Sequence, residues 1–564
     1  MAAIAEAPRL PAARSPGGWL FGPAPDLLLG CGLLSLLAFG AFLVAGPTLR
    51  IAQPGLVFPL GVLLLGMPHY GGTLLRVYER ARDRRGYAFF SFGATALVVA
   101  WFGASLFAPL AGTWLATLYL SWSPWHYTGQ NYGLAVMFLR RRGVPLAGPD
   151  KRWLYAAFLL SFALTFVAMH AEAPGSVEAP VQYASYALHV GRLGIPLAIA
   201  KPLALALGVA ALVSLARAAV GLARKAPSLA ALAPAALLAA TQAVWFALPA
   251  GALLLDTGFG FEAFDPRQRA HYVTWIALFH SAQYLWVTAY YARQSSGHHA
   301  GLYAAKVLAA GTAIWTLPSL AFGPAGLGIS SMDAGLALLI ASAVNVHHFI
   351  LDGAIWKLRG RIADVLIRSS AQHEAEERPS RALRPLVWAT CAALLAVAGW
   401  LVVEEDATRR SLAAGDVAGA EASQARLAAL GRDSGLARAA LASAHLAARE
   451  LAPARAQLER AIALAPTLEA QLLLAKLYAG ERNFADAAAA LEVAIEAAPD
   501  RVDLHTEAAR AWLAAGRGPR ALPHFARAVA LRPEDAELRA QRDRLAHLIG
   551  PGAASAPPAP SSPR

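Results

Sequence analysis

Histidine is the residue type with the clearest chemical meaning in this sequence, because it recurs inside apolar segments. His69 lies in GMPHYGG, His126 in SPWHYTGQNYG and His280 in LFHSAQYLW, and His347 and His348 are adjacent in NVHHFILDG. Ionisable side chains in apolar segments are costly and usually functional. Neutral imidazole is also a common ligand of transition metals. These residues therefore predict a shared polar site that binds a transition metal.

Polar residues that could orient the histidines stand three or four positions away from them, at Gln130, Gln283, Tyr284, Asn345 and Asp352. Residues at this spacing share one face of an α-helix. A metal-binding histidine usually donates its second N–H to a carboxylate or amide group. Adjacent residues on a helix point about 100° apart, so only one of His347 and His348 can face the site squarely. His348 is the better candidate because Asp352 follows it by one turn, and His347 would then contact a neighbouring helix.

A structural role is the alternative reading of these histidines, because imidazoles can hydrogen-bond between helices as packing contacts. A single histidine would fit that role well. The four segments, however, place their histidines at similar depths, roughly 10 to 21 Å from the next basic residue at about 1.5 Å per residue. This agreement favours one common site. His170, beside a loop, is expected to be solvated.

The segments that must position these residues are long and apolar. The chain has 564 residues, of which 57% are hydrophobic and 15% charged, and its mean hydropathy is +0.45. Soluble proteins carry about 25% charged residues. We therefore predict an all-α fold in which residues 24–403 form a polytopic helical membrane bundle of about 11 spans. The net charge of +13 is concentrated in short clusters between apolar segments, which argues against nucleic-acid binding.

The distribution of basic residues predicts how the bundle is oriented. Clusters at 76–85, 140–152 and 357–384 would all lie on the side of residues 1–23, whereas the opposite side carries few. Basic loops lie in the cytoplasm. We therefore expect a multi-pass inner-membrane protein with a cytoplasmic N-terminal tail. Everything after about residue 404 would be periplasmic or extracellular.

The C-terminal part contains a repeat marked by Pro466, Pro499 and Pro533, which are 33 and 34 residues apart. Alanines recur 24, 12 and 5 residues before each proline: Ala442, Ala475, Ala509, Ala454, Ala487, Ala521, Ala461, Ala494 and Ala528. This pattern resembles the tetratricopeptide repeat. The resemblance implies an α-solenoid with a capping helix over 434–549 that binds a protein or peptide. Residues 404–433 would be a helical stalk or a degenerate repeat, and 550–564 a disordered tail.

The strings PHY, WHYTGQ and FHSAQYL resemble motifs of the Brp/Blh family of bacterial membrane carotene-cleaving dioxygenases. That family has motifs of the type PHG, WHFG and WHxxxH on transmembrane helices. The resemblance implies that His69, His126 and His280 help to hold a non-haem iron. Gln283 and Tyr284 stand where the family's last motif has its second histidine, and VHHFILDG has no counterpart there. Iron chemistry on a lipid or polyene is the reaction that we expect, and haem or copper ligation is a further possibility.

Other classes of function remain open from the sequence. A lipid-linked glycosyltransferase would need acidic residues in an outer loop, and Asp256, Glu262 and Asp265 could supply them. A non-catalytic scaffold would anchor the repeats in the membrane, where they would bind a partner. A transporter could use the histidines as a proton relay. Metal content separates the first expectation from these alternatives.

Overall fold

The computed structural model divides the chain into two units, which are described separately. The membrane unit comprises Met1–Pro174, His189–Ser319 and Leu338–Val402, and the repeat unit comprises Gly175–Leu188, Leu320–Ala337 and Val403–Arg564. The residues that the structure describes are 16–45, 56–79, 87–172, 181–183, 186–188, 191–255, 266–296, 300–323, 326–328, 335–358, 361–367, 384–464 and 467–549. The predicted tail at 550–564 and most of the tail at 1–23 lie outside them.

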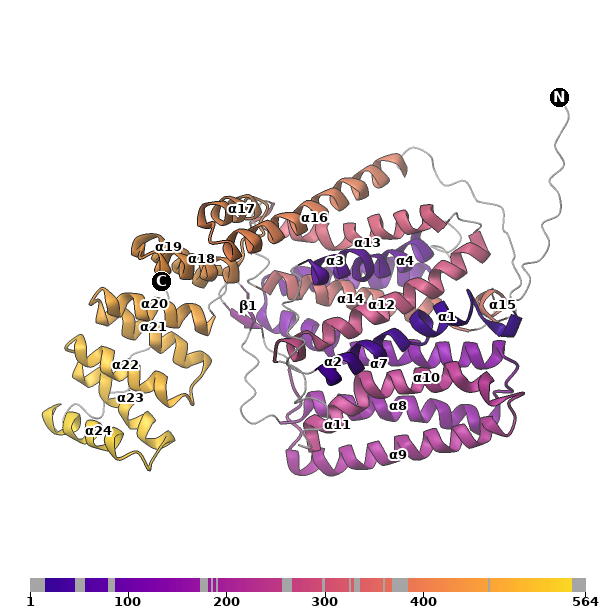
Figure 1. Cartoon of the computed structure of the whole chain (residues 1–564), viewed down its shortest axis with the longest axis horizontal. Coiled ribbons are helices and arrows are strands. Elements are labelled where there is room, and N and C mark those ends of the chain that lie inside the picture. Colours follow the sequence, from indigo (N-terminus) through magenta and orange to yellow (C-terminus); the bar gives the residue numbers. More distant parts are fainter. Residues whose placement is uncertain are drawn as a thin grey trace. The chain divides into compact units, whose positions relative to one another are not determined.

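Helices account for nearly all of the described structure up to residue 413 (Figure 1). One short antiparallel hairpin, β1 (Val181–Tyr183) with β2 (Tyr186–Leu188), interrupts them. The helical elements are η1 (Pro16–Gly18), α1 (Pro23–Pro25), η2 (Asp26–Gly30), α2 (Leu33–Ala45), α3 (Val57–Gly61), η4 (Val62–Gly66), α4 (Met67–Tyr78), η5 (Phe89–Ala94), α6 (Thr95–Ser105), α7 (Pro109–Arg141), α8 (Gly148–His170), α9 (Leu197–Ala223), η6 (Leu229–Leu232), α10 (Ala233–Gln242), η7 (Ala243–Ala247), α11 (Leu248–Leu255), α12 (Pro266–Ser296), α13 (Ala300–Phe322), α14 (Ala337–Ile355), α15 (Arg361–Leu366) and α16 (Arg384–Ala413).

Several of these helices are long and apolar enough to cross a membrane. Within the described residues there are 7, or 8 if a bent pair counts as one span: Val57–Tyr78, Gly148–His170, Leu197–Ala223, Leu229–Ala252, Ala300–Phe322, Ala337–Ile355, Pro385–Ala413, and the pair Pro23–Gly30 with Leu33–Ala41. Length and composition therefore identify fewer spans than the predicted total of about 11. Helices α7 and α12 have 33 and 31 residues, but their polar residues keep them out of this group. The apolar helix Phe89–Ser105 is shorter.

A close crossing of α4 and α13 fixes the segment that carries His69. A Cβ atom added at Gly71 would lie 1.9 Å from the carbonyl oxygen of Val307, and one added at Gly311 would lie 1.9 Å from that of Met67. Only glycine allows two backbones to approach this closely. The two helices are therefore held in one register, and α4 cannot shift along its neighbour.

Three hydrophobic clusters hold the other helices that position the histidines. Phe138, Leu238 and Trp286 belong to a cluster that joins α7, α10 and α12. The other two join α4 to α12 and α13, and α6 to α7 and α14. Because these clusters lie on α4, α7, α12 and α14, the helices that carry the four candidate ligands are packed into one bundle.

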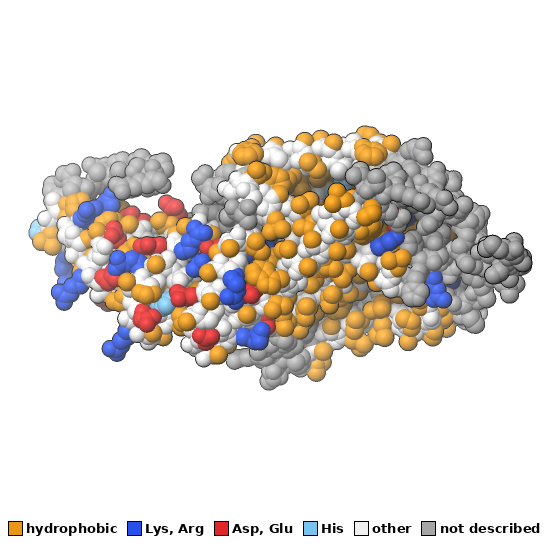
Figure 2. Space-filling view, turned by 90° about the horizontal axis from the view of Figure 1, so that it is seen from above, with side chains coloured by type: hydrophobic (Ala, Val, Ile, Leu, Met, Phe, Trp, Pro, Cys, Tyr) orange, Lys and Arg blue, Asp and Glu red, His pale blue; other side chains and the backbone are white. Residues whose placement is uncertain are grey.

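The surface of the membrane unit differs from that of the repeat unit. Large apolar side chains are exposed along α9, among them Leu205, Val209 and Leu212. Figure 2 shows one broad surface of hydrophobic side chains with few charges, and another on which basic and acidic side chains are mixed. An exposed apolar surface of this extent is what a lipid bilayer would cover.

After residue 413 the repeat unit consists of consecutive helices. They are α17 (Val417–Ala429), α18 (Gly435–Ala447), α19 (Leu451–Leu464), α20 (Leu468–Gly480), α21 (Phe484–Ala497), α22 (Val502–Ala514), α23 (Gly518–Leu531) and α24 (Ala536–Ile549). Every alanine of the sequence repeat is buried: Ala442, Ala454, Ala461, Ala475, Ala487, Ala494, Ala509, Ala521 and Ala528. The small side chains therefore lie where neighbouring helices pack.

One turn recurs between the helices of each pair. The backbone N–H groups of Asp416, Glu450, Asn483 and Arg517 donate to the carbonyls of Ser411, His445, Tyr478 and Trp512, respectively. The residue before each donor has a positive φ: Gly415, Arg449, Arg482 and Gly516. Both features belong to the Schellman ending of a helix. Since the first such turn joins α16 to α17, residues 404–433 contain a break between two helices and are not one continuous helix.

Candidate metal centre

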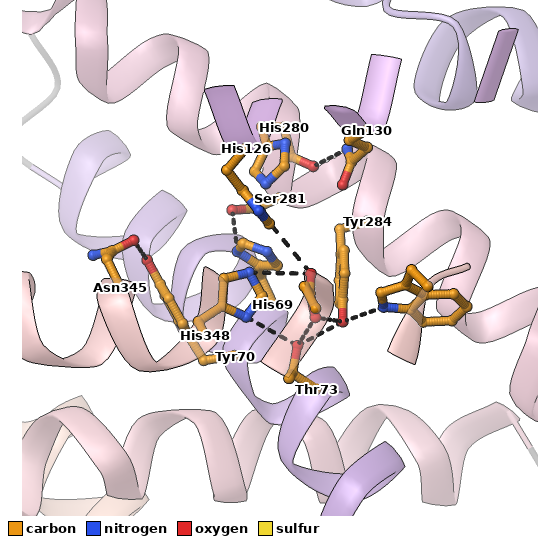
Figure 3. Close-up of polar contacts among 12 residues, drawn as sticks. His69, Tyr70, Thr73, His126, Gln130, His280, Ser281, Tyr284, Asn345 and His348 are labelled. Carbon is orange, nitrogen blue, oxygen red and sulfur yellow. Dashed lines mark hydrogen bonds and ion pairs between the residues drawn. The ribbon is translucent and has the colours of Figure 1, made fainter. Parts of the chain in front are cut away.

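Four histidines from four helices come together in the membrane unit. His69 lies on α4, His126 on α7, His280 on α12 and His348 on α14. One ligand nitrogen from each lies within 4.8 Å of those from the others, and Figure 3 shows the rings gathered at this point. His126 is partly buried, and the other three are at most 2% exposed. The structure thus assembles the four residues that the sequence singled out as ligands.

Each of these histidines has a buried ring nitrogen for which the described residues offer no hydrogen-bond partner. These atoms are Nε2 of His69, His126 and His348, and both nitrogens of His280. A buried polar atom without a partner costs about 1–3 kcal/mol. Packing histidines would satisfy these atoms with hydrogen bonds, which is not what is found. One bound metal ion would take one of these nitrogens from each ring, and the second nitrogen of His280 would still lack a partner among the described residues.

The spacing of the nitrogens is compatible with a metal ion after a small adjustment. Metal–nitrogen bonds of about 2.1 Å in tetrahedral geometry place the ligand nitrogens roughly 3.4 Å apart. The greatest separation here is 4.8 Å. Small shifts of the four side chains would close a gap of this size, so the donor set fits a transition metal that accepts imidazole.

The proton on His348 can be assigned from its partner. Thr73 Oγ1 lies 2.9 Å from His348 Nδ1 and donates its own proton to Asp352 Oδ1 at 2.8 Å. Thr73 Oγ1 also lies 2.5 Å from the hydroxyl of Tyr284. When Thr73 gives its one proton to Asp352, Nδ1 of His348 is the donor in its contact with Thr73. In this arrangement His348 is protonated at Nδ1, and the lone pair of Nε2 is free to bind a metal.

The same reasoning applies to His69. Ser281 Oγ donates to the carbonyl of Ala277 at 2.7 Å and lies 3.3 Å from His69 Nδ1. Because the Ser281 proton is already used, His69 donates from Nδ1. Two of the four rings are thus held with Nε2 available as a ligand.

Asp352 meets His348 both through Thr73 and directly. Its Oδ1 accepts from Thr73 and, at 2.9 Å, from the hydroxyl of Tyr284. Its Oδ2 lies 3.4 Å from Nε2 of His348 and 3.9 Å from Nε2 of His126. The carboxylate is therefore beside two of the candidate ligand nitrogens and could provide an oxygen ligand or balance the charge of an ion.

Aromatic rings enclose the histidines. Tyr127 stacks on His280 with ring centroids 4.1 Å apart, and Phe349 stacks on His126 at 4.4 Å. Tyr284 meets the ring of His69 edge-on at 4.5 Å. These rings limit how the imidazoles can rotate and surround the centre with apolar atoms.

Gln130, Gln283 and Asn345 do not touch a histidine ring through any contact found in the structure. Gln130 donates to the backbone carbonyl of His280 at 3.2 Å and to Gln283 Oε1 at 3.0 Å. Asn345 accepts from the hydroxyl of Tyr70 at 2.8 Å. Their predicted role as partners of the rings is not seen among these contacts, which connect helices around the site.

His347 points away from the centre. Its Nε2 lies 2.8 Å from Oγ1 of Thr95 and 3.4 Å from the hydroxyl of Tyr78. His347 thus joins α14 to α6 and α4, whereas its neighbour His348 faces the other three candidate ligands.

Thr73, Ser281 and Trp356 are residues of the site that sequence reasoning missed. Thr73 stands four positions after His69, and this helical spacing could have identified it from the sequence. Trp356 donates to the hydroxyl of Tyr284 at 3.0 Å. Serine and threonine are common in apolar helices, where they usually bond to their own backbone, so their presence alone indicates little.

Two other expectations concern residues away from the centre. His170 was expected to be solvated, but it is 4% exposed and its Nε2 lies 2.9 Å from Oγ of Ser121. Asp256, Glu262 and Asp265, the residues on which a glycosyltransferase would depend, lie outside the described residues.

Comparison with known proteins adds no assignment, since no protein-family model and no curated protein matches this chain. The class that the structure itself defines is a helical protein with several apolar helices suited to a membrane and a buried group of four histidines.

Proposed function

We propose that the membrane unit is a metal-dependent oxidoreductase in which His69, His126, His280 and His348 hold one transition-metal ion, with iron as the first candidate. The observation that supports this most strongly is the set of buried ring nitrogens within 4.8 Å that lack hydrogen-bond partners in the described structure. Non-haem iron, when bound, supplies one-electron and O₂ chemistry. Copper and zinc also accept imidazole, so the metal has to be measured.

The chain's own residues have defined tasks in this proposal. Thr73 and Ser281 accept hydrogen bonds from the Nδ1–H groups of His348 and His69 and keep both rings in the ligating tautomer. Asp352 lies beside the ligand nitrogens. Its negative charge would offset the positive charge of the metal ion, which neutral imidazoles cannot do. Tyr284 and Thr73 hold that carboxylate in place by donating to it.

The substrate class follows from the surroundings. The candidate site lies among apolar helices, and Tyr70, Tyr127, Tyr284 and Phe349 pack against its histidines. A charged, water-soluble substrate would have to be desolvated to reach it. A membrane lipid or polyene would not, and we propose one of these as the substrate.

The repeat unit would serve a different purpose, namely to bind a protein or peptide partner outside the cytoplasm. The tetratricopeptide-like spacing and the paired helices support this part of the proposal. The basic clusters of the loops support an inner-membrane protein with a cytoplasmic N-terminus and an exported repeat unit.

Metal content is the direct test of the oxidoreductase proposal. Protein extracted from membranes in mild detergent, without chelators, should contain about one metal ion per chain, as expected for four imidazole ligands around one centre. Elemental analysis identifies the metal, and an optical spectrum distinguishes non-haem iron from haem and copper. Protein that carries no metal, and takes up none from added Fe(II), would favour the membrane-anchored scaffold instead.

A further inference from the structure

A separate cavity lies in the membrane unit between α8, α9 and the segment α10–η7–α11. Its volume is about 610 Å³, within the range of about 300–1,000 Å³ that small-molecule sites occupy. Its lining is apolar except for Ser161 and Gln242. None of the four candidate metal ligands belongs to the lining, so this is a different site.

Two glycines widen the space between these helices. Gly208 of α9 and Gly251 of α11 both line the cavity, and a Cβ atom added at either would meet nothing within 4 Å. Glycines that serve close helix packing look different, as at Gly71 and Gly311, where an added Cβ would collide with a backbone carbonyl. Gly208 and Gly251 therefore leave room for a ligand and do not bring helices together.

The amide of Gln242 on the inner wall is engaged within the protein. The Gln242 amide nitrogen donates to Oγ1 of Thr128 at 2.8 Å and to Oγ of Ser161 at 3.2 Å, and its oxygen accepts from Asn131 at 3.1 Å. All hydrogen-bonding capacity of this amide except one lone pair is thus used inside the protein. A ligand at this wall has to be apolar.

The outer rim of the cavity lies on the apolar surface of α9. Leu205, Val209 and Leu212 line the cavity and are 57%, 52% and 69% exposed. Helix α9 (Leu197–Ala223) is also long and apolar enough to cross a membrane. In a bilayer the rim would therefore meet acyl chains and not water.

We propose that this cavity binds one acyl chain of a membrane phospholipid, which enters sideways past α9 and leaves its headgroup outside. The apolar lining, the two glycines and the apolar rim fit a flexible apolar chain. The inference does not depend on the metal centre, because no metal ligand lines the cavity.

Photolabelling in vesicles tests the proposal on the full-length protein. Phosphatidylcholine with a diazirine in the middle of one acyl chain is reconstituted with the protein, irradiated, and the labelled residues are identified by mass spectrometry. A chain inside the cavity should label Phe158, which lines it and is 2% exposed. Label confined to Leu205, Val209 and Leu212 would show only lipid at the outer surface and would overturn the proposal.

Variants that fill the cavity provide the second arm. In the double variant Gly208→Phe, Gly251→Phe, labelling of Phe158 should fall at least about tenfold, because added side chains occupy the space that the chain needs. Labelling of Leu212 at the rim should persist. The control is Gly103→Phe on α6, where an added Cβ also meets nothing within 4 Å but which does not line the cavity. Undiminished labelling of Phe158 in the filled variant contradicts the proposal, and the smaller variant Gly208→Leu serves if the double variant does not fold.

The metal readout separates this proposal from the proposed function. Metal content of the filled variant should equal that of the wild type whether or not the chain binds. Loss of lipid labelling with normal metal content would concern the cavity alone. Absence of metal with normal labelling would leave the cavity proposal intact and contradict only the oxidoreductase.

Discussion

At the scale of single residues, His347 and His348 show how one position along a helix separates two roles. His348 meets the other three histidines, while His347 bonds to Thr95 on α6. Adjacent residues of a helix point about 100° apart, so both could not face the same point. The pair therefore offers matched variants with the same side-chain loss, one inside the proposed centre and one outside it.

Thr73 is the residue whose replacement tests the hydrogen bonds around the ligands. Removing its hydroxyl in Thr73→Val should weaken metal affinity by about 10–100-fold, as is usual when a partner of a metal-binding histidine is lost. Thr73→Ser keeps the acceptor for His348 Nδ1 and should retain most of the affinity. Competition with a coloured chelator measures both variants. Equal affinity of the valine variant and the wild type would contradict the assigned role.

Sequence reasoning could find the histidines but not all of their partners. A histidine in an apolar segment is rare and therefore informative, so His69, His126, His280 and His348 could be selected from the sequence. Helical spacing also selected Asp352. It could not show that Thr73 stands between Asp352 and His348, because that contact depends on how α4 and α14 pack.

At the scale of elements, the turns of the repeat unit place arginine where glycine is favoured. Arg449 and Arg482 have φ values of 61°, and the equivalent Gly415 and Gly516 have 74° and 73°. A residue with a Cβ atom is strained in this left-handed region by about 1 kcal/mol or more. The sequence repeat marks alanines that are buried in the structure. It could not predict these turns, since arginine gives no indication of a left-handed residue.

Exchanging residues at two equivalent turns should have opposite effects on stability. Arg482→Gly should raise the free energy of unfolding of the 405–549 fragment by about 0.5–1 kcal/mol, because glycine removes the strain. Gly516→Ala should lower it by about 1 kcal/mol for the same reason. Urea unfolding followed by circular dichroism measures both. Arg482→Ala is the control, and its free energy of unfolding should not rise. A rise equal to that of the glycine variant would show that the arginine side chain, and not the backbone, was responsible.

His445 should make the stability of the repeat helices depend on pH. Burial alone lowers the pKa of His445, but its hydrogen bonds to Glu450 and Glu421 outweigh burial and raise the pKa above its usual 6.5. A histidine whose pKa is higher in the folded state stabilises the fold below its unfolded pKa and loses that contribution as pH rises through the folded pKa.

The contribution of His445 to the unfolding free energy of the 405–549 fragment should therefore fall as pH rises above about 6.5, the unfolded pKa of histidine. His445→Gln cannot be protonated and should show a smaller fall over the same pH range. Urea unfolding at several pH values measures the difference. An identical pH dependence in both proteins would mean that the ion pairs of His445 do not contribute.

At the scale of the whole molecule, the number of spans decides on which side of the membrane each part lies. Length and apolarity identify 7 or 8 spans, and the sequence predicted about 11. The difference arises partly because α7 and α12 carry the polar residues of the candidate site. A helix that holds a buried polar centre can cross a membrane without being strongly apolar, provided that its polar groups face the bundle.

Reporter fusions test the predicted topology. Alkaline phosphatase, which is active only after export, should be active when fused after residue 433 and inactive when fused after residue 142, in a basic loop. Activity at residue 142, or its absence at residue 433 with full expression of the fusion, would reverse the proposed side of the repeat unit.

The central claim is that four histidines form one metal centre, and matched alanine variants test it most directly. Wild-type protein, His348→Ala and His347→Ala are purified identically in mild detergent, and metal per chain is measured by elemental analysis. The account predicts about one metal ion per chain in the wild type, a nearly unchanged content in His347→Ala and loss of the metal in His348→Ala. The reason is that, of these two residues, only His348 contributes a nitrogen to the cluster. Equal metal content in the two variants, or none in the wild type, would contradict it.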